Sequence, residues 1–245
     1  IMEAIILTVV IINVAILVIF IVRDKYSYNQ IAKQQSSEML SMKFDHTENY
    51  FNEYLNRAAN FNKLLSDQIS YSEYHLEDDL SSLEEYVRYI VENSINEDSQ
   101  VSVIGYSDEL GRFLGFRINP DNTINLMLKD SRTNDKLVIY SSDNTNFDKI
   151  DEFDNYIPQN RPWYPPVKEN PTTQWSDIYL NQDELMNLTT TVSTPVFKDN
   201  KFFGIVTTDL TINAINEFLK GTSDSNNGLI YIIDEDNKVI ANSSK

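Results

Sequence analysis

The sequence predicts an α+β protein in which a long helical region precedes one antiparallel β-sheet. Two observations lead to this prediction. Residues 26–95 contain no Pro and no Gly, which is typical of helix. From about residue 100 onward, the pattern changes to short apolar runs separated by turn residues, which is typical of β-strands. A helical region followed by a set of strands indicates an α+β domain with one central sheet.

Composition excludes several classes of function. The chain has 245 residues, 37 acidic and 20 basic side chains, and no Cys, which gives a formal net charge of −17. An acidic surface repels phosphate backbones, so nucleic acid is not an expected partner. The sequence also lacks a Gly-rich phosphate loop, a His-Glu-x-x-His motif and a Gly-x-Ser-x-Gly motif. We therefore expect no catalytic residues, no cofactor and no metal site, and any catalytic output would belong to another part of a longer protein.

The N-terminal region predicts a membrane helix. Residues 4–22 are almost wholly apolar, with Thr8 and Asn13 as the exceptions. A helix of this length crosses the hydrocarbon core of a bilayer. The run is too long for the apolar part of a signal peptide, and no small-residue cleavage site follows it. We predict a transmembrane helix over residues 1–23, whose orientation the flanking charges do not fix.

Residues 24–99 are predicted to form a helical stalk, either as one long helix or as a pair of helices. Apolar side chains recur there at heptad-like spacing and form a narrow seam. The members of this seam are Phe44, Phe51, Leu55, Ala58, Leu65, Ile69, Leu76, Leu80, Leu83, Val87 and Val91. Two alternatives fit the seam equally well, namely a helix that packs on its own domain and a stalk that forms a homodimer. The two are compatible.

Residues 100–221 are predicted to form the main globular module. Strands are expected at residues 101–106, 112–117, 123–129, 137–140, 188–197 and 201–208. Residues 141–154 are expected to be a polar loop, and a proline-broken loop is expected to follow as far as Pro171. A short helix is expected over residues 211–219, with Thr211 near its N-cap and Gly221 after its end.

A second module is expected after a linker at residues 222–228. Residues 229–234 and 238–241 are apolar runs on either side of an acidic turn, which predicts a β-hairpin. An isolated hairpin is only marginally stable in water, so the rest of its sheet is expected beyond residue 245. Residues 228–245 are therefore predicted to begin a second module that is truncated here.

The candidate binding site centres on Arg161, which stands among three aromatic residues in the segment Tyr156–Tyr164. Pro158 and Pro162 hold this backbone out of regular helix and fix where its side chains point. A planar guanidinium beside large aromatic faces suits a small pocket that binds a carboxylate or another planar anion.

Asp209 supplies the opposite charge at the end of the apolar run 202–208, and Tyr179 lies between that run and Arg161. An Arg for an anion, an Asp for a cation and aromatic walls together predict a receptor site for a small zwitterion. A second role for Asp209 is to cap the helix expected after Thr211, and the two roles are compatible.

These features resemble the double Cache sensor domains of bacterial transmembrane receptors. The resemblance is carried by Arg161-Pro-Trp163-Tyr164, Trp175-Ser-Asp-Ile-Tyr179, Pro195-Val-Phe and Phe203-Gly-Ile-Val-Thr-Thr-Asp209. It covers about residues 24–245 and implies two PAS-like modules. The membrane-distal module, here residues 100–221, usually holds the ligand in this family. The resemblance also implies an inner-membrane receptor whose sensor region is periplasmic or extracellular.

The amino-acid-binding version of this family has a signature that the chain matches in type and spacing. The matching residues are Tyr156, Arg161, Trp163, Tyr179 and Asp209. The resemblance implies that Arg161 and Trp163 hold the carboxylate of a ligand, and that Tyr156, Tyr179 and Asp209 hold its ammonium group. Tyr164 belongs to the same candidate site, where we expect it, like Trp175, to form pocket wall or packing rather than ligand hydrogen bonds.

The expected function is an extracytoplasmic ligand-sensing domain of a bacterial transmembrane signalling receptor, namely a chemoreceptor, a sensor kinase or a cyclic-dinucleotide enzyme. The expected ligand is a small amino acid or a related amine. The expected macromolecular partners are the membrane, through one helix, and a second copy of the chain, through the stalk. Two alternatives stay open, namely a sensor for another small molecule such as an organic acid or a purine, and a ligand-independent dimerisation module.

Overall fold

The computed structural model describes residues 2–72, 79–94, 101–141, 148–181, 187–222 and 228–244, without the side chains of residues 3–10 and 94. The chain divides into two compact units, residues 1–53 and residues 54–245. Helix α1 (Met2–Tyr71) makes up the described part of the first unit and also supplies the first helix of the second.

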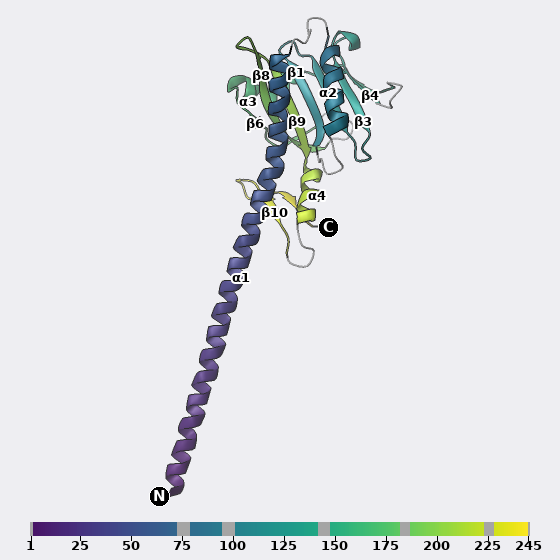
Figure 1. Ribbon diagram of the computed structural model, residues 1–245. Helices are drawn as coiled ribbons and strands as arrows, with labels where there is room; N and C mark the ends of the chain where they lie inside the picture. Colours follow the sequence, from purple (N-terminus) through teal and green to yellow (C-terminus); the bar gives the residue numbers. More distant parts are fainter. Residues whose placement is uncertain are drawn as a thin grey trace. The chain divides into compact units, whose positions relative to one another are not determined.

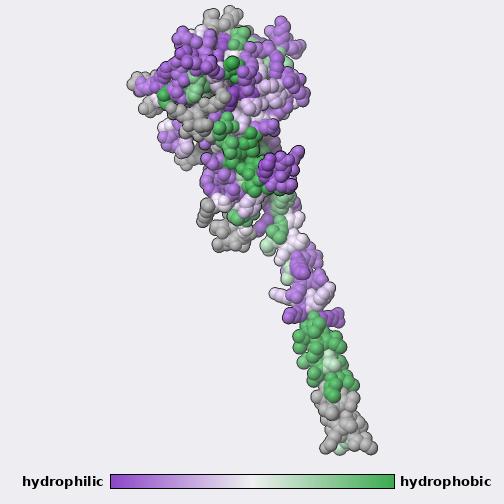
Figure 2. Space-filling model, turned by 180° about the vertical axis from the view of Figure 1, so that it is seen from behind, coloured by the Kyte–Doolittle hydropathy of each residue, from purple (hydrophilic) through white to green (hydrophobic). Residues whose placement is uncertain are grey.

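In the first unit, α1 carries exposed apolar side chains. Residues 11–22 are apolar apart from Asn13 and are exposed, and Figure 2 shows them as a green band near the N-terminal end of the helix. Within the described residues, no helix has an apolar stretch long enough to cross a membrane. The membrane helix predicted over residues 1–23 includes residue 1 and the side chains of residues 3–10, which lie outside the description, so it stays a prediction. Phe44, the first member of the predicted seam, is exposed.

In the second unit, the predicted helical region is a pair of helices, because α1 ends at Tyr71 and α2 runs from Ser81 to Ser94. Most of the predicted seam is buried there, and Leu76 lies outside the described residues. The buried members are Ala58, Leu65 and Ile69 on α1, together with Leu80, Leu83, Val87 and Val91. This part of the seam therefore packs on its own domain. The homodimer stays a prediction.

An antiparallel sheet forms the centre of the second unit, with the strand order β5-β4-β3-β2-β1-β9-β8-β6 and with β7 also paired to β8. The strands predicted from the sequence are confirmed. The described strands of this sheet are β1 (Val101–Asp108), β2 (Phe113–Ile118), β3 (Ile124–Lys129), β4 (Leu137–Ser141), β5 (Lys149–Phe153), β6 (Gln174–Trp175), β7 (Tyr179–Leu180), β8 (Leu188–Lys198) and β9 (Lys201–Thr211).

The two segments predicted as loops contain regular structure, so that prediction was wrong in part. Strand β5 lies at the edge of the sheet and is mostly polar, so it has no apolar alternation to reveal it. Strands β6 and β7 lie after both segments, where no element was predicted, and each has two residues paired with β8, which no local pattern predicts. The proline-rich segment holds the 3-10 turn η2 (Pro158–Asn160) and helix α3 (Tyr164–Glu169), and a further 3-10 turn, η1 (Ser131–Thr133), precedes β4.

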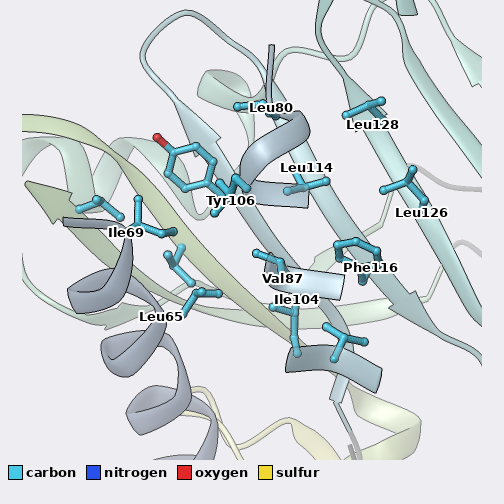
Figure 3. Close-up of a cluster of buried hydrophobic side chains, with 14 residues drawn as sticks. Leu65, Ile69, Leu80, Val87, Ile104, Tyr106, Leu114, Phe116, Leu126 and Leu128 are labelled. Atoms are coloured by element: carbon cyan, nitrogen blue, oxygen red, sulfur yellow. The ribbon is translucent and has the colours of Figure 1, made fainter. Parts of the chain in front are cut away.

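The two faces of the sheet are covered by different parts of the chain, because successive side chains of a strand point to opposite faces. Helices α1 and α2 cover one face (Figure 1). Side chains such as Ile104, Leu114 and Phe116 pack there against Leu65 and Val87 from the helices (Figure 3). The other face packs against the segment that contains η2 and α3, and it carries the cavity described below.

A buried amide joins α1 to the sheet. Asn62 is 0% exposed, and its Nδ2 donates hydrogen bonds to the carbonyl oxygens of Val192 (2.7 Å) and Val206 (3.3 Å). The hydroxyl of Thr208 donates to Asn62 Oδ1 at 2.6 Å. Both ends of the amide are therefore bonded to β8 or β9, which fixes the position of this helix along the two strands.

Helix α4 (Ile212–Thr222) follows β9 directly. The backbone N–H of Ala214 donates to the hydroxyl of Thr211 at 3.1 Å, which confirms the predicted cap. The predicted end before Gly221 was wrong, since the helix includes this residue and ends at Thr222. The ends of a helix are its least sharply defined part, and a glycine near the end does not by itself fix the last helical residue.

The predicted C-terminal hairpin is confirmed as β10 (Tyr231–Ile233) paired with β11 (Val239–Asn242) in a separate sheet. The backbone N–H of Asn242 donates to Asn216 Oδ1 on α4 at 2.8 Å, so the hairpin is bonded to this helix. Most of the predicted linker, residues 223–227, lies outside the described residues. That the hairpin begins a second module stays a prediction.

We predict that Asn62→Ala lowers the free energy of unfolding by about 2–4 kcal/mol, because it leaves buried polar groups on β8 and β9 without their partner. Urea denaturation followed by circular dichroism measures this change. Asn60→Ala is the matched control, since Asn60 is exposed on the same helix. Equal stabilities of the two variants would contradict the anchoring role of Asn62.

Candidate functional site

Prolines shape the backbone around Arg161. Pro158 opens η2, where its missing N–H is tolerated. Arg161 then adopts an extended backbone with φ −80° and ψ 146°, as the residue before Pro162 is expected to do. Pro165 and Pro166 occupy the first turn of α3, where prolines are also tolerated. These constraints hold Arg161 at a bend between η2 and α3, with its side chain buried.

A cavity of about 450 Å³, its mouth included, lies on the sheet face opposite α1 and α2. Most of this volume is the open mouth, since the enclosed space is about 20 Å³, close to what one water molecule needs. Strands β1 to β5, β7 and β9 and the segment around η2 all contribute to its wall. The lining residues are Val103, Phe113, Met127, Leu137, Phe153, Tyr156, Trp163, Tyr179, Asn181, Thr207 and Asp209.

Asp209 is joined to Tyr179 through the hydroxyl of Thr191. Thr191 Oγ1 donates to Asp209 Oδ1 at 2.7 Å, and the hydroxyl of Tyr179 lies 2.7 Å from the same Thr191 oxygen. A threonine hydroxyl has one proton, so Tyr179 is the donor in the second bond. Burial, and then the charge of Asp209, raises the pKa of Tyr179 above its ordinary value, which keeps the phenol protonated for this role.

Arg161 stacks on the aromatic wall of the cavity. Its Cζ lies 5.2 Å from the ring centroid of Tyr179, within the range of a cation–π contact. Its Nη2 is buried and has no hydrogen-bond partner among the described residues. A buried guanidinium nitrogen without an acceptor is unfavourable, and a carboxylate of a bound molecule would relieve this cost.

The structure brings most of the predicted site residues together. Tyr156, Trp163, Tyr179 and Asp209 line one cavity. Arg161 does not line the cavity. It contacts the ring of Tyr179, and Tyr179 does line the cavity. The guanidinium therefore lies beside an aromatic residue, as predicted. The ring of Tyr179 contacts Arg161, and the hydroxyl of Tyr179 is linked to Asp209 through Thr191.

Tyr164 lies outside the cavity lining and packs around it. Its ring centroid is 5.9 Å from that of Trp163 and 6.4 Å from that of Phe202. Burial raises the pKa of Tyr164 to about 12. The packing role expected for this residue agrees with these contacts.

Sequence reasoning missed several cavity residues. Thr207 lies two positions before Asp209 and shares its strand face, and Thr191 is the cross-strand partner of Asp209 in the β8–β9 hairpin. Alternate residues of a strand share a face, so counting back from Asp209 along β9 gives Thr207. Continuing through the hairpin turn at Asp199 to the paired position on β8 gives Thr191. Asn181 follows the short strand β7, and no local pattern indicates its position.

Residues 112–217 match a protein family described as methyl-accepting chemotaxis protein-like, first PDC sensor domain. These residues are therefore similar to a PDC sensor domain. The matched residues extend from β2 through β9 into α4 and so include Arg161, Tyr179 and Asp209. No curated protein matches the sequence.

Solved structures share the fold of this chain at low sequence identity. The sensory domain of the Campylobacter jejuni chemoreceptor Tlp3 has a TM-score of 0.54 and 13% identity, over 78% of this chain and 65% of that one. The same domain with isoleucine bound has a TM-score of 0.52 and 13% identity, over 78% and 64% of the two chains. A structure named methyl-accepting chemotaxis protein X has a TM-score of 0.56 and 11% identity, over 82% and 71%. The chain thus spans less than two thirds of the Tlp3 domain, and the likeness establishes the PAS-like sensor fold.

We predict that Thr191→Val lowers the free energy of unfolding by about 1–3 kcal/mol, because it removes the hydroxyl between Tyr179 and Asp209 while keeping the shape of the side chain. Thermal and urea denaturation measure this change. Thr172→Val, at an exposed position, is the control and should leave stability unchanged. A Thr191→Val protein as stable as the wild type would show that the hydroxyl link does not order the site.

Proposed function

We propose that this chain is the extracytoplasmic sensor region of a bacterial transmembrane receptor and that its cavity binds a small amino acid or a related amine. The observation that carries the proposal is the contact of Arg161 with Tyr179, a cavity residue whose hydroxyl is linked to Asp209 through Thr191. This grouping combines a guanidinium with an unpaired buried nitrogen, an aromatic ring and a carboxylate.

The carboxylate of the ligand would bind near Arg161 and Trp163. A hydrogen bond between a guanidinium and a carboxylate contributes about 1.5–3 kcal/mol when it is shielded from water. Trp163 lines the cavity and can donate its indole N–H, which is a donor only. Both residues lie on the proline-constrained segment, so they need little reorganisation on binding.

The ammonium group of the ligand would bind near Asp209, between the rings of Tyr156 and Tyr179. The Thr191 bond orients the Asp209 carboxylate, and all three residues proposed to hold the ammonium group line the cavity. An ammonium group against aromatic faces adds about 0.5–2 kcal/mol. A guanidinium and a carboxylate at one site favour zwitterions over molecules with a single charge. Organic acids are therefore disfavoured as ligands. The sensory domain of Tlp3, which shares the fold, has been solved with isoleucine bound.

The receptor part of the proposal uses the rest of the chain. The membrane helix would cover residues 1–23. The exposed apolar side chains of α1 in the first unit would contact lipid and a second copy of the chain. A ligand that binds two conformations with different affinity shifts their populations, and this difference would be the signal. The output domain would lie outside this chain and would supply any catalytic activity.

We expect at least one amino acid or small amine to stabilise the purified chain in a thermal-shift panel of amino acids, amines, organic acids and purines. A ligand at 100 times its dissociation constant adds about 2.7 kcal/mol to the free energy of unfolding. Calorimetric titration then gives the affinity. A panel in which only organic acids or purines bind would overturn the ligand class, and a panel without any binding would favour the ligand-independent dimerisation module.

We expect Arg161→Ala and Asp209→Asn each to weaken the binding of that ligand by about 10-fold or more, because each removes one charged clamp. Asp209→Asn keeps the side-chain shape and an oxygen that can accept from Thr191. Asp177→Asn is the matched control, since Asp177 is exposed and outside the cavity lining. Unchanged affinity in both site variants would show that the ligand binds elsewhere.

A further inference from the structure

The lining changes along the sheet: β9 and the residues at β7 contribute polar side chains, while β1 to β5 contribute apolar ones, which we call the apolar end. Asp209, Thr207, Asn181, Tyr156, Trp163 and Tyr179 supply the polar groups, while the remaining lining residues are Val103, Phe113, Met127, Leu137 and Phe153. Among the described lining residues, Asp209 is the single one with a formal charge at neutral pH. A charged group of a ligand that reached the apolar end would therefore lose its hydration without gaining a partner.

Phe113, on β2, packs against aromatic residues of the proposed binding site. Its ring is packed edge-on against Tyr156, with ring centroids 5.4 Å apart and an interplanar angle of 61°, and lies 6.4 Å from the ring of Trp163. These two neighbours belong to the predicted ligand-binding segment. The Phe113 ring therefore lies beside the aromatic residues that would hold the charged end of a ligand.

Two glycines make room for this ring. Gly105 on β1 and Gly115 on β2 are directly paired across the strands, on the same sheet face as Phe113. A Cβ atom on Gly115 would lie 2.8 Å from Phe113 Cε1, and one on Gly105 would lie 3.1 Å from the same ring and 2.8 Å from Thr207 Oγ1. Such distances are shorter than van der Waals contact, so any other residue at either position would displace a cavity-lining side chain.

We propose that Phe113, seated over the Gly105–Gly115 pair, is the specificity-determining residue that limits the size of the ligand's side chain, and that the ligand is an amino acid with a short, uncharged, aliphatic side chain. The proposal rests on the proposed binding of an amino acid with its ammonium group at Asp209. In that orientation the side chain extends toward the apolar end. The glycine pair sets how deeply the Phe113 ring can withdraw from the cavity.

Calorimetric titration of the whole chain with L-alanine, L-valine, L-leucine, L-phenylalanine, L-aspartate and L-lysine tests this proposal. We expect the wild type to bind valine more tightly than phenylalanine, aspartate or lysine. Phe113→Ala should raise the affinity for phenylalanine relative to valine by about 10-fold or more, since a hydrophobic pocket discriminates by about this factor for small changes in size. Phe113→Leu provides the same comparison with less loss of core packing.

Gly115→Ala should act in the opposite direction, because it pushes the Phe113 ring toward the ligand. The affinity for leucine should fall by about 10-fold relative to that for alanine. Gly221→Ala and Phe197→Ala are the controls, since a Cβ on Gly221 meets nothing within 4 Å and Phe197 is exposed and outside the lining. Neither control should change the order of affinities.

The outcomes separate this proposal from the proposed function. If the wild type binds a neutral aliphatic amino acid but Phe113→Leu and Gly115→Ala leave the order of affinities unchanged, Phe113 does not set the size limit. If the wild type binds aspartate or lysine best, the apolar end does not receive the side chain, although amino-acid binding stands. If no amino acid or amine binds, both proposals fail.

Discussion

The pairing of β8 with β9 is the constraint on which the rest of the second unit depends. Because successive side chains of a strand point to opposite faces, Thr191 and Asp209 face the cavity while Val192 and Thr208 face the helices. The hydroxyl of Thr191 binds the carboxylate of Asp209 on one side, and Asn62 binds Thr208 and the carbonyl of Val192 on the other. A displacement of these strands at the cavity therefore also changes the bonds to α1. A one-residue slip of the β8–β9 register would exchange the two faces and destroy both sets of contacts.

The candidate site joins this rigid sheet to a segment held by prolines. The position of Arg161 is fixed by the local backbone, whereas that of Asp209 is fixed by strand register. Tyr179 contacts Arg161 with its ring and is linked to Asp209 through the hydroxyl of Thr191. A site built in this way is preorganised, because neither charged group depends on a mobile loop for its position. In the part of the chain that the structure describes, the buried Nη2 of Arg161 has no hydrogen-bond partner, a cost that a bound anion would remove.

The fold and the site support the function at different levels. The likeness to solved sensory domains establishes a PAS-like sensor fold, and residues 112–217 match a PDC sensor family. At 11–13% identity, that likeness does not transfer a ligand, so the ligand class is inferred from the charges and the apolar lining of this cavity. The apolar end around Phe113 would in addition limit the size and polarity of the ligand's side chain, which the charged groups do not.

The amino-acid sequence by itself determined the elements with strong local patterns. Apolar alternation fixed the main strands, the absence of Pro and Gly fixed the helical region, and the Arg161 segment with Tyr179 and Asp209 indicated the site. Tertiary structure alone decided that β6 and β7 are strands, since two residues carry no period and pair only because β8 presents its edge. It also decided that Thr191 links Tyr179 to Asp209 and that Gly105 and Gly115 seat the ring of Phe113. Contacts of this kind depend on strand register and on side-chain packing between distant segments, which are set when the sheet assembles and not by neighbours in the chain.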